Sequence, residues 1–288
     1  MLLNDILTDL YFPKKRSISS DSTRKHYRIA VKQFSEWLGH PAELADLNDD
    51  SVDDWLTFLL HEGRLSPYTV KQRRTYILAL WNWLAKRRLV ERFPCVGPVK
   101  APEIVPDAWS ETELGLLLRH CSRQRGWICG VPASKWWLTI HTWWFYEGER
   151  IGATLNCRWE WLQDGVIVIP ALARKGSTKT AVYHLHPETV AALETIRQPE
   201  REFIWPWEAT ESAFYHRYKR LIQTSGLAWR KGTGPHKVRR SHATLIEKYG
   251  GDASLSLMHS SSTTTKKHYI DPRIAHPTPE NRKLPRIA

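Results

Sequence analysis

Residues 93–108 constrain the fold of this chain more than any other segment. Their sequence, FPCVGPVKAPEIVPDA, contains four prolines and one glycine. Proline has no backbone N–H to donate, so neither a helix interior nor a central strand continues through such a segment. The chain has 288 residues, which is enough for two ordinary domains with a core each. We therefore expect a linker here, with one domain on either side.

The segment before this linker has the pattern of a small all-helical domain. Apolar residues recur at helical spacing in three stretches that begin near residues 22, 52 and 67. The third stretch follows the sequence SPYT, which suits a helix start because proline is tolerated in the first turn. Its face opposite the apolar stripe carries three basic residues, Lys71, Arg73 and Arg74.

The segment after the linker mixes helices with a small amount of strand. A Ser-x-x-Glu capping box at 109–114 starts a helix, and a tryptophan-rich helix runs from about Ser134. Two β-prone runs, at 166–171 and 180–186, flank the turn-forming sequence ARKGSTK and predict a hairpin. Further helices are expected at 187–197, 208–225 and 236–249.

These patterns predict a mainly α fold with a small β-sheet, an α+β architecture. The expected parts are an N-terminal arm at 1–16, a helical domain at 17–100, a linker at 101–108, a mixed domain at 109–272 and a proline-rich tail at 273–288.

The chain is strongly basic, with a net charge of +12 and a pI near 9.6. This charge favours a polyanionic partner, with nucleic acid first and an anionic membrane surface second. The longest apolar stretch, at 136–146, is too short to span a bilayer, and the amino terminus lacks the basic start of a signal peptide. The four cysteines form no CxxC pair, and no zinc-ligand spacing occurs. We therefore expect a cytoplasmic protein with free thiols, no membrane partner and no cofactor.

Five polar residues in the second half of the chain each have an ordinary explanation when taken alone. Arg150 follows two glutamates and could form a surface ion pair. Lys175 would be a solvated residue of the hairpin tip, and His236 would cap its helix. His259 would be a hydrogen-bonded histidine beside a serine-rich loop, and Tyr269 would lie in the core or in an interface.

In combination, these residues predict a site for a phosphodiester. Gly234 and Pro235 place His236 and Arg239 in the first turn of a helix, where residues three apart share a face and free N–H groups favour an anion. Arg239 and Arg150, from separate segments, suit the two non-bridging oxygens of one phosphate. A hairpin lysine can protonate a leaving oxygen, and a tyrosine hydroxyl can act as a nucleophile. This chemistry needs no metal ion.

The order of these motifs resembles that of the tyrosine recombinase (phage integrase) family. The sequence contains ERIGATLNCRW, then ARKGSTK, then HKVRRSHATL, and finally MHSSSTTTKKHY, in which a histidine precedes a tyrosine by ten positions. Residues 17–100 are similar to the family's core-binding domain, and residues 106–272 are similar to its catalytic domain. The resemblance implies that the two domains form a C-shaped clamp around duplex DNA.

The resemblance implies six catalytic residues, namely Arg150, Lys175, His236, Arg239, His259 and Tyr269. The two arginines and the histidine of the third motif would hold the scissile phosphate, and His259 would add a hydrogen bond to it. Lys175 would protonate the leaving 5′ oxygen, with Lys179 as the alternative because the register of the hairpin is open. Tyr269 would form a 3′-phosphotyrosyl bond, which conserves the bond energy so that strands rejoin without ATP.

Three positions depart from the family pattern. Ala153 stands where the family often has an acidic residue three positions after the arginine. The usual Leu-Gly before the histidine is Leu257-Met258, and the residue before the candidate nucleophile is His268 and not a second tyrosine. We interpret Ala153 as a change that alters the reaction rate without abolishing the chemistry.

The resemblance therefore implies a site-specific DNA recombinase that acts on double-stranded DNA. It would work as a homotetramer on paired recombination sites, with accessory DNA-bending proteins as optional partners. Phosphate contacts supply most of the affinity for DNA. The expected residues for these contacts are Lys71, Arg73, Arg74, Lys237 and Arg240.

Two other functions stay open. A type IB topoisomerase uses the same chemistry but relaxes supercoiled DNA as a monomer, and a DNA-binding regulator would retain the fold without the reaction. The helical amino-terminal domain favours the recombinase over the topoisomerase. The complete set of catalytic residue types favours an enzyme over the regulator. A purely structural basic protein would not explain the ordered motifs.

Overall fold

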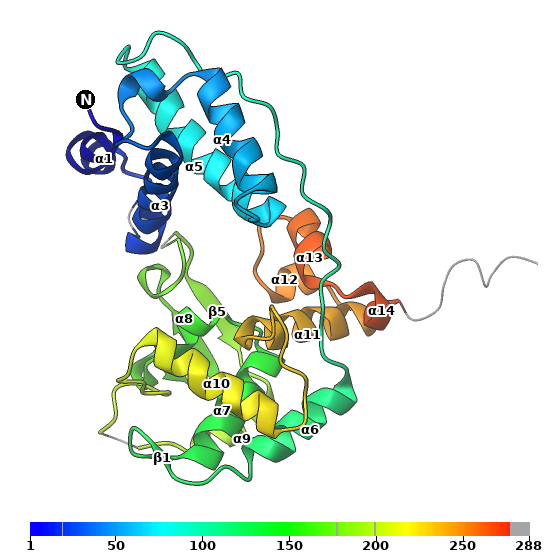
Figure 1. Ribbon diagram of the computed structural model, residues 1–288. Helices are drawn as coiled ribbons and strands as arrows, with labels where there is room; N and C mark the ends of the chain where they lie inside the picture. The colour runs from blue at the N-terminus through cyan, green and yellow to red at the C-terminus, as the bar shows by residue number, and fades with distance from the viewer. Residues whose placement is uncertain (19, 177, 199, 277–288) are drawn as a thin grey trace, which may run out of the picture. The chain divides into compact units, whose positions relative to one another are not determined.

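The computed structural model describes residues 1–18, 20–176, 178–198 and 200–276. The chain divides into two compact units, Met1–Ile104 and Val105–Ala288, and each has its own hydrophobic core. In Figure 1 the helices of the first unit are coloured from blue to cyan, and the elements of the second run from green to red. We describe each unit by itself.

The first unit is built from helices whose starts are set by local capping. Ser20, Asn48 and Ser66 each accept a hydrogen bond from a backbone N–H in the first turn of the helix that follows. The elements are α1 (Leu3–Asp5), the π-helical η1 (Ile6–Tyr11), α2 (Phe12–Lys14), α3 (Asp21–Leu38), the 3-10 helix η2 (Leu44–Asp46), α4 (Asp49–His61) and α5 (Pro67–Lys86).

The first residues of the chain belong to this unit, which corrects the prediction of a separate arm at 1–16. Leu3, Leu7 and Tyr11 are fully buried in the core of the unit. The hydroxyl of Tyr11 donates to the hydroxyl of Tyr27 on α3 over 3.0 Å. The sequence did not suggest this packing because the segment is short and its apolar residues follow a π-helical rather than an α-helical repeat.

The second unit combines helices with two small antiparallel sheets. Its elements are α6 (Glu111–Cys121), β1 (Trp127–Ile128), β2 (Val131–Pro132), α7 (Ala133–Tyr146), α8 (Ile151–Leu155), η3 (Trp159–Trp161), β3 (Leu162–Gln163), β4 (Val166–Ile169), η4 (Ala171–Ala173), β5 (Ala181–His184), α9 (Pro187–Glu194), α10 (Glu211–Thr224), α11 (Pro235–Lys248), α12 (Ala253–Ser256), α13 (Ser262–Tyr269) and α14 (Pro272–Ala275).

The three-stranded sheet has the order β3-β4-β5, and its last two strands form the predicted hairpin. Ile167 pairs with Tyr183 and Ile169 with Ala181, so these four side chains share the buried face, while Val168 on the other face is exposed. The alternation of buried and exposed residues is the reason this segment forms a strand. Residues 170–176 and 178–180 lie between these two strands.

Helix α7 is the centre of the second unit. Its four tryptophans, Trp136, Trp137, Trp143 and Trp144, are all buried, and the helix packs against α6, α9 and α11. The hydroxyl oxygen of Thr154 on α8 accepts from the indole N–H groups of both Trp143 and Trp144 (3.1 and 3.0 Å). This pairing satisfies two buried donors, as a dry core requires, and holds α8 against the end of α7.

The prediction of a mainly α fold with small β-sheets is confirmed. The clamp around DNA stays a prediction, as do the remaining domain boundaries. Of the predicted tail at 273–288, residues 277–288 lie outside the described residues. Within the described part of the chain, no helix combines the length and the apolar character needed to cross a bilayer.

Candidate active site

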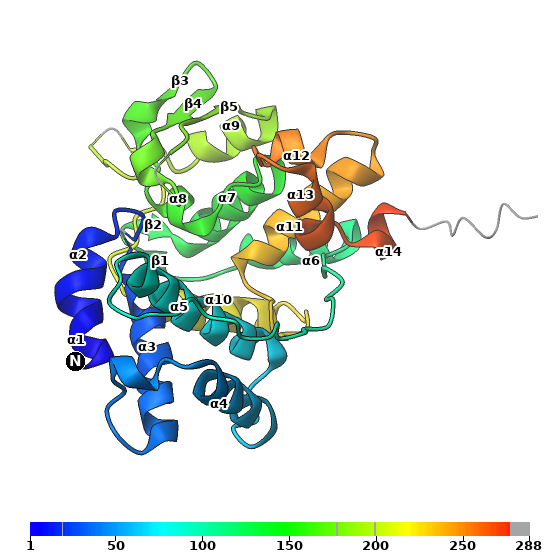
Figure 2. The ribbon, with the colours of Figure 1, turned by 90° about the horizontal axis from the view of Figure 1, so that it is seen from above.

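Four segments of the second unit bring the predicted catalytic residues together. Arg150 is the N-cap residue of α8, and His236 and Arg239 lie in the first two turns of α11. His259 precedes α13, and Tyr269 is the last residue of that helix. Helices α12, α13 and α14 all pack on α11, so the segment that carries His259 and Tyr269 lies against this helix (Figure 1 and Figure 2).

These segments enclose a pocket with a volume of about 1090 Å³. Its wall includes five of the six predicted catalytic residues: Arg150, Lys175, His236, Arg239 and Tyr269. The sixth, His259, is not part of the pocket lining but lies within hydrogen-bonding distance of Arg150 and Arg239. The predicted residues are 119 positions apart along the chain at most, so only the tertiary fold explains why they share one pocket.

Arg239 is the structural centre of the site, although only 1% of it is exposed. Its Nη1 donates to the backbone carbonyl of Gly148, and its Nη2 donates to the carbonyl of Leu257 (3.1 Å). Its guanidinium carbon lies 5.6 Å from the ring centroid of Tyr269. Burial, together with the charge of Arg150, lowers the pKa of Arg239 below its ordinary value. The side chain therefore ties the turn before α8 to the segment that carries His259.

His259 bridges the two arginines. Its Nε2 lies 3.3 Å from Nη2 of Arg150 and 3.0 Å from Nη2 of Arg239. A guanidinium only donates hydrogen bonds, so Nε2 must be the acceptor and Nδ1 must carry the proton. This proton is donated to the hydroxyl oxygen of Thr265 on α13, 2.8 Å away. Burial and the two arginine charges lower the pKa of His259 to about 4, so the ring is neutral at pH 7.

Tyr269 lies between the two histidines. The centroid of its ring is 5.0 Å from that of His236 and 4.6 Å from that of His259. Its backbone carbonyl accepts from the hydroxyl of Thr244 on α11 (3.1 Å), which fixes the end of α13. His236 is exposed as a whole, but desolvation of its ring and the charges of the neighbouring arginines lower its pKa to about 4. The ring of Tyr269 therefore packs against two neutral imidazoles, of which His259 already accepts at Nε2 from both arginines. His236 is the one of the two that can accept a proton.

The hairpin places one of the two candidate lysines on the pocket. Lys175 is exposed and lines the pocket. Lys179 is also exposed, and its backbone carbonyl accepts from Nη1 of Arg174 (3.2 Å). The hairpin register that the sequence left open therefore favours Lys175 by position.

Glu149 is a site residue whose sequence context indicated only an ion-pair partner of Arg150. Its side chain is fully buried, and it accepts from the backbone N–H of Arg150 (2.7 Å), from Nε of Arg174 (2.8 Å) and from the hydroxyl of Tyr183 (3.0 Å). It also lies 3.7 Å from Nη1 of Arg239. Burial alone would raise the pKa of Glu149, but the hydrogen bond and the arginine charges outweigh burial and lower it. The signal in the sequence was a carboxylate next to the first arginine.

Two of the predicted DNA contacts in the first unit face the protein. Arg73 is buried, and its Nε donates to the side-chain oxygen of Gln33 on α3 (2.6 Å), so its placement on an exposed basic face is wrong. Arg74 donates to the carbonyls of Val96 and Gly97, both over 2.6 Å. Lys71 is exposed as predicted. Helix α5 packs against both α3 and α4, so its buried face is wider than one apolar stripe.

Two further predicted DNA contacts, Lys237 and Arg240, have partners within the second unit. Lys237 is buried, its Nζ lies 2.5 Å from a carboxylate oxygen of Asp107, and it sits over the ring of Trp109. Its placement as a flanking charge on the surface is therefore wrong. Arg240 is partly buried and donates to the carbonyl of Gly232 (2.7 Å). Lys237 therefore connects α11 to the segment before α6, and Arg240 connects it to the loop before α11.

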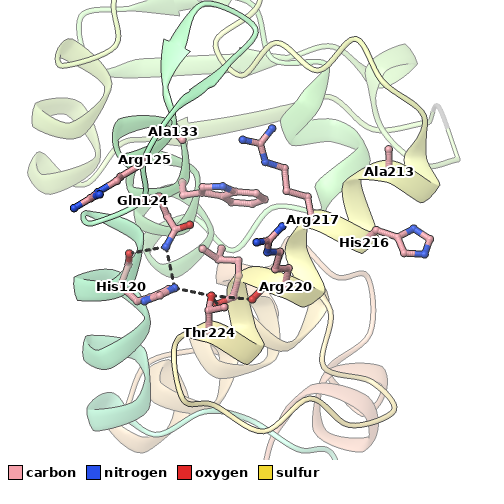
Figure 3. A pocket seen from close by; sticks show the side chains of 11 residues that line it. His120, Gln124, Arg125, Ala133, Ala213, His216, Arg217, Arg220 and Thr224 are labelled. Carbon is pink, nitrogen blue, oxygen red and sulfur yellow. Dashed lines mark hydrogen bonds between the residues drawn. The ribbon is translucent and has the colours of Figure 1, made fainter.

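A second pocket of this unit, with a volume of about 1020 Å³, lies between α6 and α10 (Figure 3). Three exposed arginines, Arg125, Arg217 and Arg220, line it together with His120 and His216. Its lining contains neither a carboxylate nor any of the six predicted catalytic residues. Arg217 and Arg220 lie on α10 and Arg125 follows α6, and no sequence motif singles out these arginines.

Metal binding has no candidate site in the described residues: no three of their histidine, cysteine, aspartate and glutamate side chains are grouped as ligands for an ion.

Comparisons with known proteins identify the fold. Residues 7–91 match the model of the phage integrase N-terminal SAM-like domain. The chain superposes on a lambda integrase (75–356) dimer bound to a COC′ core site with a TM-score of 0.70 at 17% identity, which covers 92% of this chain and 97% of that one. The chain has the tyrosine recombinase fold. The resemblance that the sequence motifs indicated is thereby confirmed.

Two further tyrosine recombinase structures agree with this fold. The Tn1549 transposon integrase in complex with transposon right end DNA has a TM-score of 0.70 at 13% identity, over 92% of this chain and 93% of that one. The XerH site-specific recombinase bound to palindromic difH substrate has a TM-score of 0.66 at 18% identity, over 91% and 78%. No curated protein matches the sequence.

Proposed function

We propose that this chain is a site-specific DNA recombinase that cleaves and rejoins DNA through a tyrosine. The observation that carries the proposal is the position of Tyr269, which lines the same pocket as Arg150 and Arg239 and packs against two neutral histidines. A nucleophile, a proton acceptor and two cations that can bind phosphate are the parts that a phosphodiester transfer needs.

In the proposed reaction, Arg150 and Arg239 bind the non-bridging oxygens of the scissile phosphate. The hydroxyl oxygen of Tyr269 attacks the phosphorus, and the bond to the 5′ oxygen breaks as the new phosphotyrosyl bond forms. The two cations stabilise the charge that accumulates on the phosphate in the transition state. One phosphodiester replaces another, so the step needs no ATP, and the reverse step by a 5′ hydroxyl rejoins the strand.

The protons of this reaction have a donor and an acceptor in the pocket. His236 is neutral and beside Tyr269, so it takes the phenolic proton as the hydroxyl attacks. Lys175 on the hairpin gives a proton to the leaving 5′ oxygen. Nε2 of His259 accepts from both arginines, whereas a bound phosphate would need it to donate. The negative charge of the phosphate favours protonation of this ring and supplies the donor.

Duplex DNA is the partner that the proposal requires, with a tetramer assembled on paired sites. The comparison structures of lambda integrase include a dimer on a core site and a tetramer on a Holliday junction. For this chain, exposed basic residues would contact the DNA backbone, among them Lys71 in the first unit and Arg125, Arg217 and Arg220 around the second pocket. In the proposal they take the place of Arg73 and Lys237, because Arg73 donates to Gln33 and Lys237 is paired with Asp107.

The test is covalent trapping in the presence of EDTA. Duplex DNA from beside the chain's own gene, nicked near candidate sites so that cleavage cannot reverse, is mixed with the protein and the sample is denatured. We expect a DNA adduct on a peptide that contains Tyr269, and we expect it to vanish in Tyr269→Phe while DNA binding remains. Tight, salt-sensitive binding without any adduct would favour a DNA-binding regulator. Relaxation of supercoiled DNA without a specific site would favour a topoisomerase.

A further inference from the structure

The pocket is built around one buried carboxylate, that of Glu149. Three of its four polar neighbours lead to groups that must act together: the backbone N–H of Arg150, Nη1 of Arg239, and Nε of Arg174, which precedes Lys175 on the hairpin. The fourth neighbour is the hydroxyl of Tyr183 on β5, which is the strand that carries the other side of the hairpin. Glu149 therefore contacts Arg150, Arg239 and the residue before Lys175, and these are the segments that supply the cations of the site.

A second buried glutamate shows that burial alone does not explain this arrangement. Glu147 lies two positions earlier and accepts from the backbone N–H of His186 (3.0 Å) and the hydroxyl of Thr189 (2.9 Å). Both partners lie at the start of α9, outside the pocket lining. Burial raises the pKa of Glu147, whereas that of Glu149 is lowered in spite of burial. Only Glu149 is in an environment that favours a charged carboxylate.

The position at which the sequence departs from the family pattern lies in the same pocket. Ala153 is buried, lines the pocket and offers no carboxylate to the arginines. Arg150 and Arg239 converge on one histidine nitrogen, and two cations so placed repel one another unless an anion is near. In this chain the nearest carboxylate to Arg239 is that of Glu149.

We propose that Glu149 is the positioning carboxylate of this site, supplied from the position before Arg150 in place of position 153. It holds Arg239 against the turn that carries Arg150, and through Arg174 it holds the hairpin so that Lys175 faces the pocket. Glu149 touches no reacting atom in this scheme and acts only through the arginines and the hairpin. The inference rests on the proposed function for its effect on the reaction, but its effect on the hairpin can be measured without DNA.

The experiment compares Glu149→Gln with Glu147→Gln as a matched control. Both variants replace a buried carboxylate by an amide of the same size within the same short segment. The first measurement is single-turnover cleavage of the nicked duplex used for trapping. The second is amide hydrogen exchange of the DNA-free protein at residues 171–176 and 181–184. Thermal unfolding of both variants shows that they are folded.

We expect Glu149→Gln to slow cleavage by about 100-fold, the effect of displacing a catalytic group by about 1 Å, and to raise exchange in the hairpin. Glu147→Gln should leave the cleavage rate within about threefold of the wild type and should not change exchange in the hairpin. Equal behaviour of the two variants in both measurements would overturn the proposal. Faster exchange with unchanged cleavage would reduce Glu149 to a structural residue and overturn its positioning role.

If the wild-type protein forms no adduct, the proposed function fails, and hydrogen exchange alone then decides whether Glu149 holds the hairpin. Unchanged exchange in Glu149→Gln would in that case overturn the inference as well.

Discussion

The turn before Arg150 allows a sharp test of how tightly the site is packed. Gly148 has φ = +65°, and its carbonyl accepts from Arg239. A Cβ added to it would lie 2.7 Å from Cδ2 of His242 and 3.0 Å from Cδ2 of Leu257. His242 cannot move aside without loss, because its ring nitrogens bond the carbonyl of Phe145 and the hydroxyl of Ser256, both over 2.6 Å.

The expected cost of Gly148→Ala is the sum of two effects. A side chain in the left-handed region costs about 1 kcal/mol. Forcing a methyl group into a packed core costs about 1–3 kcal/mol more. We therefore expect a loss of about 2–4 kcal/mol in the free energy of unfolding. Cleavage should slow by more than about tenfold, because the displaced turn carries both Glu149 and Arg150 and accepts from Arg239.

The matched control is Gly250→Ala. Gly250 also has a left-handed backbone, with φ = +78°, but a Cβ added to it would meet nothing within 4 Å. This variant should lose only about 1 kcal/mol and should cleave DNA at the wild-type rate. Urea denaturation, followed by tryptophan fluorescence, gives the two stabilities, and single-turnover trapping gives the two rates. Equal losses of stability in the two variants would refute the packing argument at Gly148.

Three other predictions concern proton binding, the general acid and the contact with DNA. Burial lowers the pKa of His242 to about 4, below the ordinary 6.5, so the unfolded chain binds a proton that the folded chain excludes. The free energy of unfolding should therefore fall as the pH drops from 6.5 to about 4, by up to about 3 kcal/mol from this residue. The melting temperature should depend less on pH in His242→Gln than in the wild type. Lys175→Ala should slow cleavage when the leaving group is an ordinary 5′ oxygen, but not when it is a 5′-thiol, which needs no proton. Lys179→Ala should leave both cleavage rates unchanged. The opposite pattern would assign the general acid to Lys179. The double variant Arg217→Ala/Arg220→Ala should weaken DNA binding and reduce the slope of log K against log salt concentration by about 2. Fluorescence anisotropy titrations at several salt concentrations would measure this slope. An unchanged slope would exclude the second pocket from the DNA contact.

Much of this protein follows from its sequence, because the relevant signals are local. The helix starts at Ser20, Ser66 and Ser110 depend on a side chain and a backbone N–H three residues away. The hairpin of β4 and β5 depends on the alternation of buried and exposed residues along two short runs. The order and spacing of the motif residues are likewise properties of the sequence, and they are sufficient to indicate the tyrosine recombinase fold.

The tertiary structure decided which charged side chains are available. Arg73 and Lys237 looked like surface cations, but their partners are Gln33, 40 positions away, and Asp107, 130 positions away. Glu149 looked like a neighbour of Arg150, yet it binds Arg174 and approaches Arg239, which come from other elements. A periodic pattern shows which face of an element is apolar, but not which polar residues at its edges become buried. That depends on the elements packed against it, and only the folded chain brings those together.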